Sequence, residues 1–347
     1  MCTGWPTAKI GVMLNYESLH NHTTSSDGTQ DYLDVLAAAE QHGLGVMALT
    51  DHDALPGEQD LARLRAYDGP VQWLVGIEIT SYVPREVGGP ERGALHVLGL
   101  FVDPTNRPLV EFCARAEEGR RVRMRAVIKH LQGIGFRVTE EDVLRHAPSK
   151  NIVLPHMVSA VMEKPENRKL ADEIRERMRV EAEHDAEVKR AYDDMMEFGP
   201  KQYPYALFMT RHAYVPLVQD EVVNLLDLDR TVKLIREAGG VAVMGHWFFN
   251  ENKLSEAGLA AVLNRGGLDG LESVIVNTMG DKAPDEDVRR TRELIRRFGV
   301  AETMGSDSHS AADLEAFAGS KFAPESVGQT ARLIERFKPD LHWSNWA

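Results

Sequence analysis

Short runs of hydrophobic residues alternate with amphipathic stretches over the first hundred residues of the chain. A stretch over 31–42 carries apolar side chains at helical spacing and ends before Gly43, a residue type that commonly terminates helices. Compact apolar runs, which are typical of buried strands, lie at 14–19, 46–49, 71–79 and 95–102. The alternation predicts parallel strands joined by helices, either in an open sheet or in a barrel.

The same alternation returns in the last third of the chain, after a long interruption. Helical stretches (231–238, 255–264, 285–298) there alternate with strand-like runs (241–244, 271–276, 300–304). Between the two halves, the pattern is almost wholly helical, and charged residues occupy more than half of positions 163–197. The sequence therefore predicts one α/β domain, residues 1–103 and 220–347, interrupted by a helical insertion over 104–219.

Composition agrees with a globular protein. The chain has 347 residues, of which 43% are hydrophobic and 27% charged, and no apolar run is long enough to span a bilayer. The N-terminus shows no signal-peptide pattern, and the two cysteines, Cys2 and Cys113, form no disulfide framework, so we expect a cytoplasmic protein. The pattern does not predict an oligomeric state.

The net charge of −13 disfavours binding to duplex nucleic acid, which needs a basic surface. It is compatible with a small anionic substrate if bound metal ions reverse the potential locally. Interaction with a membrane is not expected either.

Candidate metal ligands lie within or shortly after the predicted strands. Because the carboxyl ends of parallel strands meet at one edge, we expect these side chains to converge. The alternating geometry of extended backbone also places residues two positions apart on the same side. A mixed His, Asp and Glu set without thiolates predicts zinc, manganese or iron. The nine candidates are His20, His22, Asp27, His52, Glu78, His96, His246, Asp307 and His309.

These segments resemble the successive motifs of the PHP (polymerase and histidinol phosphatase) family. The resemblance covers roughly residues 14–103 and 220–315, through the runs LHNHTTSSDG (19–28), LTDHD (49–53), GIE (76–78), HVLG (96–99), GVAVMGH (240–246) and GSDSH (305–309). In the insertion, residues 119–121, 155–156 and 213–216 resemble the stand-alone nucleotide-phosphatase branch. That branch removes phosphate from nucleoside bisphosphates or short RNA ends.

The resemblance implies a distorted β/α barrel of about seven strands that holds two or three divalent ions. The insertion would serve as a cap that recognises the substrate. Asp307 would accept a proton from a metal-bridging water that attacks a phosphoester. Asp51 would not bind metal itself and would instead orient one of the ligating imidazoles. The implied ligand sets are His20, His22, Glu78 and Asp307 for the first ion, Glu78, His96 and His246 for the second, and Asp27, His52 and His309 for the third.

Two positions depart from the nucleotide-phosphatase pattern. Leu154 stands where an arginine commonly precedes the Pro-His pair, so His156, Arg211 and His212 become the candidate substrate contacts. After His246, the aromatic run 247–249 replaces a proline, and it either lines a pocket for an aromatic substrate or packs under the insertion. The four arginines within 120–125 would surround a helix and are predicted to be solvated.

Three functions remain open on the sequence alone. The first is a metal-dependent phosphoesterase that acts on a small phosphorylated metabolite or nucleotide. The second uses the same metal site to hydrolyse a carboxylic ester, lactone or amide, with aromatic substrates among the candidates. The third is a non-catalytic metal-binding domain, which the complete set of nine ligand-type residues disfavours.

Overall fold

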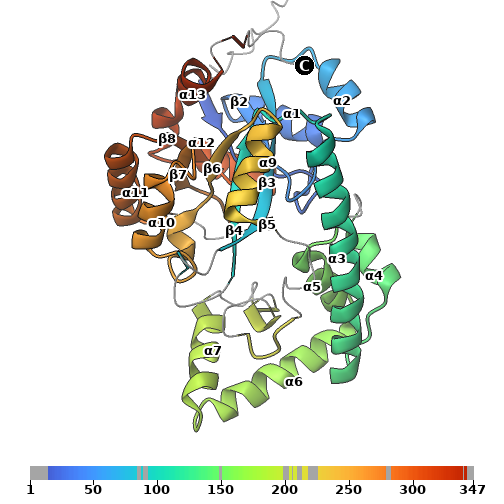
Figure 1. Ribbon diagram of the computed structural model, residues 1–347. Coiled ribbons are helices and arrows are strands. Elements are labelled where there is room, and N and C mark those ends of the chain that lie inside the picture. Colours follow the sequence, from blue (N-terminus) through green and yellow to red (C-terminus); the bar gives the residue numbers. More distant parts are fainter. Residues whose placement is uncertain are drawn as a thin grey trace, which may run out of the picture.

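The computed structural model describes residues 15–83, 87–88, 93–147, 151–197, 203–204, 206–208, 213–217, 226–278, 283–338 and 340–341. A strand-rich body occupies the upper part of Figure 1, and the helices of the insertion extend below it. The α/β fold and the predominantly helical middle segment are both as the alternation predicts.

Eight strands form one sheet in the described part of the chain. Seven of them follow the order β1-β2-β3-β4-β6-β7-β8, and the short β5 pairs with the carboxyl end of β3. The strands are β1 Tyr16–Ser18, β2 Leu44–Leu49, β3 Gln72–Tyr82, β4 Ala94–Leu100, β5 Leu226–Asp227, β6 Val241–Met244, β7 Gly270–Ile275 and β8 Ala301–Gly305.

The sheet closes on itself through the segments that follow β1 and β8. The Leu19 N–H donates to the Met304 carbonyl at 3.1 Å, and the Asp307 N–H donates to the His20 carbonyl at 3.0 Å. The His22 N–H donates to the Ser308 carbonyl at 2.8 Å, which extends the same parallel pairing by another step. These bonds confirm the distorted barrel and place the residues after the first strand beside those after the last.

One strand contradicts the expectation of a uniformly parallel sheet. β4 runs antiparallel to both of its neighbours, β3 and β6. The reason is the short connection over residues 83–93, because a parallel return requires a longer crossover, usually with a helix. His96 consequently lies near the beginning of its strand, yet this end of β4 faces the same edge of the barrel as the carboxyl ends of the parallel strands.

Alternation along the strands separates the barrel interior from the face that the helices cover. On β3, Leu74 lies in a cluster with inward-facing residues of the neighbouring strands, whereas Val75, Ile77 and Ile79 pack in the cluster beneath the helices. Glu78 has the same parity as Leu74 and therefore projects into the barrel. The interior is apolar at one end and polar at the other, as His96 above Leu98 and Leu100 also illustrates.

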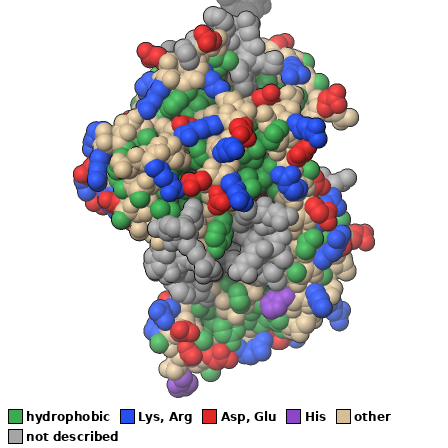
Figure 2. Space-filling model, viewed as in Figure 1, with side chains coloured by type: hydrophobic (Ala, Val, Ile, Leu, Met, Phe, Trp, Pro, Cys, Tyr) green, Lys and Arg blue, Asp and Glu red, His purple; other side chains and the backbone are tan. Residues whose placement is uncertain are grey.

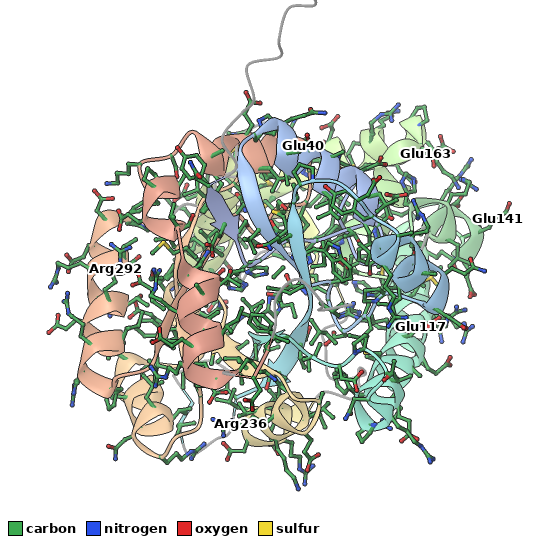
Figure 3. The ribbon with its side chains drawn as sticks, turned by 90° about the horizontal axis from the view of Figure 1, so that it is seen from above. Glu40, Glu117, Glu141, Glu163, Arg236 and Arg292 are labelled. Atoms are coloured by element: carbon green, nitrogen blue, oxygen red, sulfur yellow. The ribbon has the colours of Figure 1, made fainter. Side chains whose placement is uncertain are left out.

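Helices surround the barrel on its outside, as the view from above shows (Figure 3). Their apolar faces supply much of the larger hydrophobic core. No helix in the described part of the chain combines the length and hydrophobicity needed to span a lipid bilayer. These helices are α1 Tyr32–Gln41, α2 Glu58–Arg65, α9 Leu228–Glu237, α10 Glu256–Asn264, α11 Asp285–Phe298, α12 Ala311–Ala318 and α13 Gln329–Phe337, with 3-10 helices at Trp247–Asn250 (η2) and Ala323–Ser326 (η3).

The insertion builds a hydrophobic core of its own, and α3 joins it to the barrel. The first half of α3 packs into the barrel core through Leu109 and Phe112, and its second half packs into the insertion core through Val127 and Leu131. Figure 1 shows this long helix running from the side of the barrel down to the other helices. The insertion helices are α3 Arg107–Ile134, α4 Glu140–His146, α5 Leu154–Glu163, α6 Pro165–Glu181 and α7 Ala186–Glu197.

Candidate metal centre

Four ligand-type side chains meet at the polar end of the barrel. The Nε2 atoms of His20 and His22 lie 3.3 Å apart. Asp307 Oδ1 is 3.3 Å from Nε2 of His20 and 3.0 Å from Nε2 of His22. The carboxylate of Glu78 completes the group at 3.3 Å from His20 and 3.2 Å from His22. Closure of the barrel explains the convergence, because it pairs the segment carrying the two histidines with the one carrying Asp307.

The separation of these donor atoms suits a single metal ion. A tetrahedral centre with bonds of about 2.0–2.1 Å places its ligand atoms about 3.3–3.4 Å from one another. The observed distances of 3.0–3.3 Å are close to that value. The four residues therefore need little rearrangement to hold a divalent cation.

A second group shares Glu78 with the first. Glu78 Oε1 lies 2.8 Å from Nδ1 of His96 and 3.2 Å from Nε2 of His246. These two imidazole nitrogens are 3.2 Å from each other. Glu78 also contacts the first group, so its carboxylate is shared by the two groups.

A third group lies on the other side of His22. Asp27 Oδ1 is 3.4 Å from Nε2 of His309, and Asp27 Oδ2 is 3.8 Å from Nε2 of His52. His52 faces two ways, because its Nδ1 is 2.9 Å from Glu78 Oε2. The imidazole of His52 thus lies between the third group and the shared carboxylate, a double position that the sequence does not reveal.

Hydrogen bonds determine which nitrogen of several imidazoles faces the centre. Nδ1 of His20 contacts the Glu272 carboxylate, and Nδ1 of His309 contacts the Asp307 carbonyl at 2.9 Å. Carboxylates and carbonyls only accept hydrogen bonds, so both Nδ1 atoms carry the proton. In the neutral rings, the Nε2 lone pairs then face carboxylate oxygens, an arrangement that favours a cation between them.

Unsatisfied atoms and shifted pKa values give the same indication. Asp27 Oδ1, His52 Nδ1 and Glu78 Oε2 are buried and form no well-aligned hydrogen bond within the described part of the chain, although His52 Nδ1 and Glu78 Oε2 lie 2.9 Å apart. Burial lowers the pKa of the His22 imidazole, but the hydrogen bond to Asp307 and the nearby Glu78 carboxylate outweigh this effect and raise it to about 10. Burial raises the pKa of the Glu78 carboxyl, and the surrounding imidazoles overcome this and hold it well below its usual range. The carboxylates at this centre therefore strongly favour a positive charge among them, on an imidazolium or on a bound cation.

Asp51 reaches the centre through a hydroxyl. Its Oδ1 accepts a hydrogen bond from Ser26 Oγ at 2.6 Å, and Ser26 Oγ lies 3.2 Å from Nδ1 of His22. Asp51 also accepts hydrogen bonds from the N–H and the hydroxyl of Thr23, both at 2.8 Å. The carboxylate therefore holds the turn that carries His22.

Glu272 contacts two of the candidate ligands directly, and the sequence reasoning missed it. Its carboxylate lies 3.1 Å from Nδ1 of His20 and accepts the His246 N–H at 2.9 Å. The available signal was a lone acidic residue inside the apolar run of β7. Its position in the middle of the strand gives no local sign of a contact with His20 or His246.

Side chains of the insertion approach the centre from its His52 side. His156 is buried on α5, and its Nδ1 accepts the Val153 N–H at 3.3 Å, which leaves the proton on Nε2. Burial lowers the pKa of His156, and the nearby Asp27 carboxylate opposes this shift. The Asn151 amide donates to the His52 carbonyl at 2.6 Å. The other two predicted substrate contacts, Arg211 and His212, lie outside the described residues.

The arginines of α3 correct one expectation from the sequence. Arg120 and Arg123 are buried instead of solvated. The Arg120 guanidinium pairs with Asp53, which directly follows His52, and Asp53 also accepts the Thr80 N–H at 2.9 Å. The position of α3 against the barrel explains the difference, because one face of the helix is enclosed between the two cores.

The aromatic run after His246 does not form a pocket as a whole. Trp247 and Phe248 are buried in the barrel core, and the indole N–H of Trp247 donates to the Leu254 carbonyl at 2.7 Å. Phe249 alone is exposed, at 43%, with its ring centroid 6.5 Å from that of His246. This arrangement weakens the case for an enclosed aromatic site.

Comparisons with known proteins identify phosphoesterases as relatives. No protein-family model matches the chain. It is 26% identical to the phosphoribosyl 1,2-cyclic phosphate 1,2-diphosphodiesterase of Eggerthella lenta over 84% of this chain and 94% of that protein. It is also 27% identical to the 3′,5′-nucleoside bisphosphate phosphatase of Chromobacterium violaceum, over 39% of this chain and 45% of the relative.

A solved structure adds the same indication at the level of the fold. The crystal structure of a putative metal-dependent phosphoesterase from Bifidobacterium adolescentis superposes with a TM-score of 0.60 at 25% identity. The superposition covers 85% of this chain and 88% of that one. The resemblance to metal-dependent phosphoesterases that the motifs indicate is confirmed.

Proposed function

We propose that this chain is a metal-dependent phosphoesterase that hydrolyses an ester of a small phosphorylated metabolite or nucleotide. The observation that carries the proposal is the group formed by His20, His22, Glu78 and Asp307 at the closure of the barrel. The two imidazole Nε2 atoms lie 3.3 Å apart and are 3.0–3.3 Å from carboxylate oxygens of Glu78 and Asp307. The phosphoesterase activities of the relatives support the same reaction class.

The three groups of side chains would hold two or three divalent ions. His20, His22, Glu78 and Asp307 would hold the first ion, and Glu78, His96 and His246 would hold the second. Asp27, His52 and His309 serve the third. Nitrogen and carboxylate donors without sulfur suit manganese, zinc or iron. Because Nδ1 of His52 faces Glu78, this imidazole can instead join the second ion.

The bound ions supply Lewis acidity toward the phosphoryl oxygens and lower the pKa of a coordinated water. Asp307 is the residue that accepts a proton at the site. Its carboxylate is ionised at neutral pH, because neighbouring imidazoles outweigh the effect of burial and hold the pKa of the Asp307 carboxyl far below its usual range. The backbone bond to the His20 carbonyl keeps Asp307 in place.

Residues of the insertion would bind the substrate. Nε2 of His156 carries a proton that can be donated to a phosphate oxygen, and the imidazole is close enough to Asp27 for that carboxylate to raise its pKa against the effect of burial. We include Arg211 and His212 as further contacts on the strength of their sequence position.

The surface charge is better suited to a small anionic substrate than to a nucleic-acid duplex. On the face shown in Figure 2, lysine and arginine side chains are interspersed with aspartate and glutamate and form no continuous basic surface. The chain has a net charge of −13, so attraction of an anion would depend on the bound ions. With Cys113 in the free state, a reducing cytoplasm remains the compartment that we propose.

Phosphate release from a panel of substrates tests the proposal. The metal-free protein is reconstituted with manganese or zinc and assayed on nucleoside monophosphates, 3′,5′-bisphosphates, cyclic phosphates, sugar phosphates and an aryl phosphate. We expect metal-dependent turnover that is lost in Asp307→Asn and kept in Asp172→Asn, a control on the exposed face of α6. Hydrolysis of carboxylic esters, lactones or amides in place of phosphate esters would contradict it.

A further inference from the structure

A buried carboxylate lies between two of the candidate metal groups and belongs to neither. Glu272 is in the middle of β7, with only 1% of its surface exposed and the apolar Leu271 and Val274 close by in the strand. Burying an ionised carboxylate is strongly unfavourable unless hydrogen-bond donors surround it. The donors that surround Glu272 are therefore informative about what the residue does.

Both oxygens of Glu272 contact residues that we assign as ligands. Nδ1 of His20 lies 3.1 Å from Oε1 and 3.2 Å from Oε2. The backbone N–H of His246 donates to Oε2 at 2.9 Å. His20 belongs to the first group and His246 to the second, so a single carboxylate contacts both groups.

The contact with His20 directs its ring toward the first group. A carboxylate holds the proton on Nδ1, which leaves the Nε2 lone pair facing Asp307 and Glu78. A charged acceptor on the far nitrogen also makes the imidazole a stronger electron donor. His22 differs in this respect, because its Nδ1 faces the neutral hydroxyl of Ser26.

The contact with His246 supports an unfavourable backbone conformation. His246 has φ 28° and ψ 45°, in the left-handed region that residues other than glycine rarely adopt. Such a conformation persists only where the surroundings hold it, and the hydrogen bond from its N–H to Glu272 is such a constraint. That bond helps to hold the ring of His246 3.2 Å from Glu78, together with the Asn250 amide, which lies 3.3 Å from Nδ1 of the ring.

We propose that Glu272 is a positioning residue that couples the first and second metal centres by orienting His20 and His246 together. This inference rests on the proposed function, because it assumes that both histidines bind metal. It predicts that loss of the carboxylate weakens both centres, although Glu272 itself binds neither ion.

Metal titration of three proteins tests the proposal. Wild type, Glu272→Gln and Glu17→Gln are stripped of metal and titrated with Mn²⁺ and with Zn²⁺ against a chelator of known affinity. Glu17 is the matched control, because it is a buried carboxylate that accepts the N–H groups of Gly328 at 2.6 Å and Thr330 at 2.7 Å, at the start of α13. Both variants remove a buried negative charge.

We expect Glu272→Gln to bind both ions about 10–100-fold more weakly, as is usual when a partner of a metal ligand is lost. Glu17→Gln should lower the melting temperature and leave metal affinity at the wild-type value. Wild-type affinity in Glu272→Gln would overturn the coupling role. A wild-type protein that binds no divalent ion would instead overturn the proposed function.

A second measurement needs no variant and keeps the proposal testable if Glu272→Gln does not fold. Long-range ¹H–¹⁵N correlation spectra of the wild-type protein with zinc report which nitrogen of His20 carries the proton. We expect the proton on Nδ1 of His20. Finding it on Nε2 would contradict the role of Glu272 directly.

Discussion

In the barrel, acidic side chains and histidines lie buried at the polar end of the strands and contact partners that are distant in sequence. Along α6 and α7 of the insertion, most acidic and basic side chains lie on exposed helix faces and pair with neighbours three or four residues away, as Arg179 does with Glu176 and Glu183. His22 and Asp307, by contrast, are 285 positions apart. The same residue types thus form a reactive centre where the fold buries them together, and a solvated surface where it does not.

The outer surface of the barrel resembles the insertion more than the barrel's own interior. Arg236 and Arg292, labelled in Figure 3, lie at the periphery on α9 and α11 and pair with Asp269 and Glu302. Burial and direction toward the barrel axis therefore distinguish the candidate site, whereas residue type alone does not. The predictions below test that distinction.

Replacement of the shared carboxylate should have the largest effect. Glu78→Gln removes the charge that the first two groups share, and we expect it to lower turnover by about 1,000-fold or more and to reduce the number of bound ions. Glu163→Gln is the matched change in the insertion, where this exposed residue pairs with Arg145. Activity and metal content should stay at the wild-type values in Glu163→Gln. Equal losses in both variants would refute the distinction between buried carboxylates of the barrel and exposed carboxylates of the insertion.

Metal removal should destabilise the barrel more than the insertion. At an ion concentration of about 100 times Kd, binding stabilises the folded state by about 3 kcal/mol, so we expect chelation to lower Tm by roughly 5–10 °C. Hydrogen exchange should rise at the His22 and Asp307 amides, which close the barrel beside the ligands. Helix α6 should exchange as before. A uniform rise in exchange across the chain would show that the two regions respond as one unit.

Loss of the Ser26 hydroxyl should produce a smaller change at the same centre. Ser26 connects Asp51 to Nδ1 of His22, so Ser26→Ala leaves that imidazole without its partner. We expect metal affinity to fall about 10-fold, less than for Glu272→Gln, because a neutral partner is lost instead of a charged one. Competition with a chelator measures both variants. A larger effect from Ser26→Ala would reverse this ranking.

The sequence predicts the α/β alternation, the helical middle segment and the positions of the ligand-type residues, because period-two and helical patterns are local signals. The pattern of apolar residues does not predict that β4 is antiparallel. The direction of β4 follows from the connection over 83–93, which is too short for a parallel crossover. The local pattern does not predict the role of Glu272, because that role arises from long-range contacts with His20 and His246. It does not predict the burial of Arg120 either, because that burial depends on where α3 packs.

The smallest effect is expected in the insertion, at the start of α4. Asp142 completes a capping box with Thr139 and also accepts hydrogen bonds from Arg145 and Lys164. Asp142→Asn should cost about 1 kcal/mol of unfolding free energy without changing turnover or metal content.

The pH dependence of that cost has a definite sign. The hydrogen bond from Lys164 is the largest of the effects that hold the pKa of the Asp142 carboxyl far below its usual range, so its contribution is fully present above the unfolded pKa of about 3.9. The contribution declines as the pH falls below that value toward the folded pKa. Denaturant unfolding of wild type and Asp142→Asn at pH 7 and at pH 3 measures the difference. The gap in unfolding free energy should be wider at pH 7, and a gap that widens on acidification would contradict the assignment.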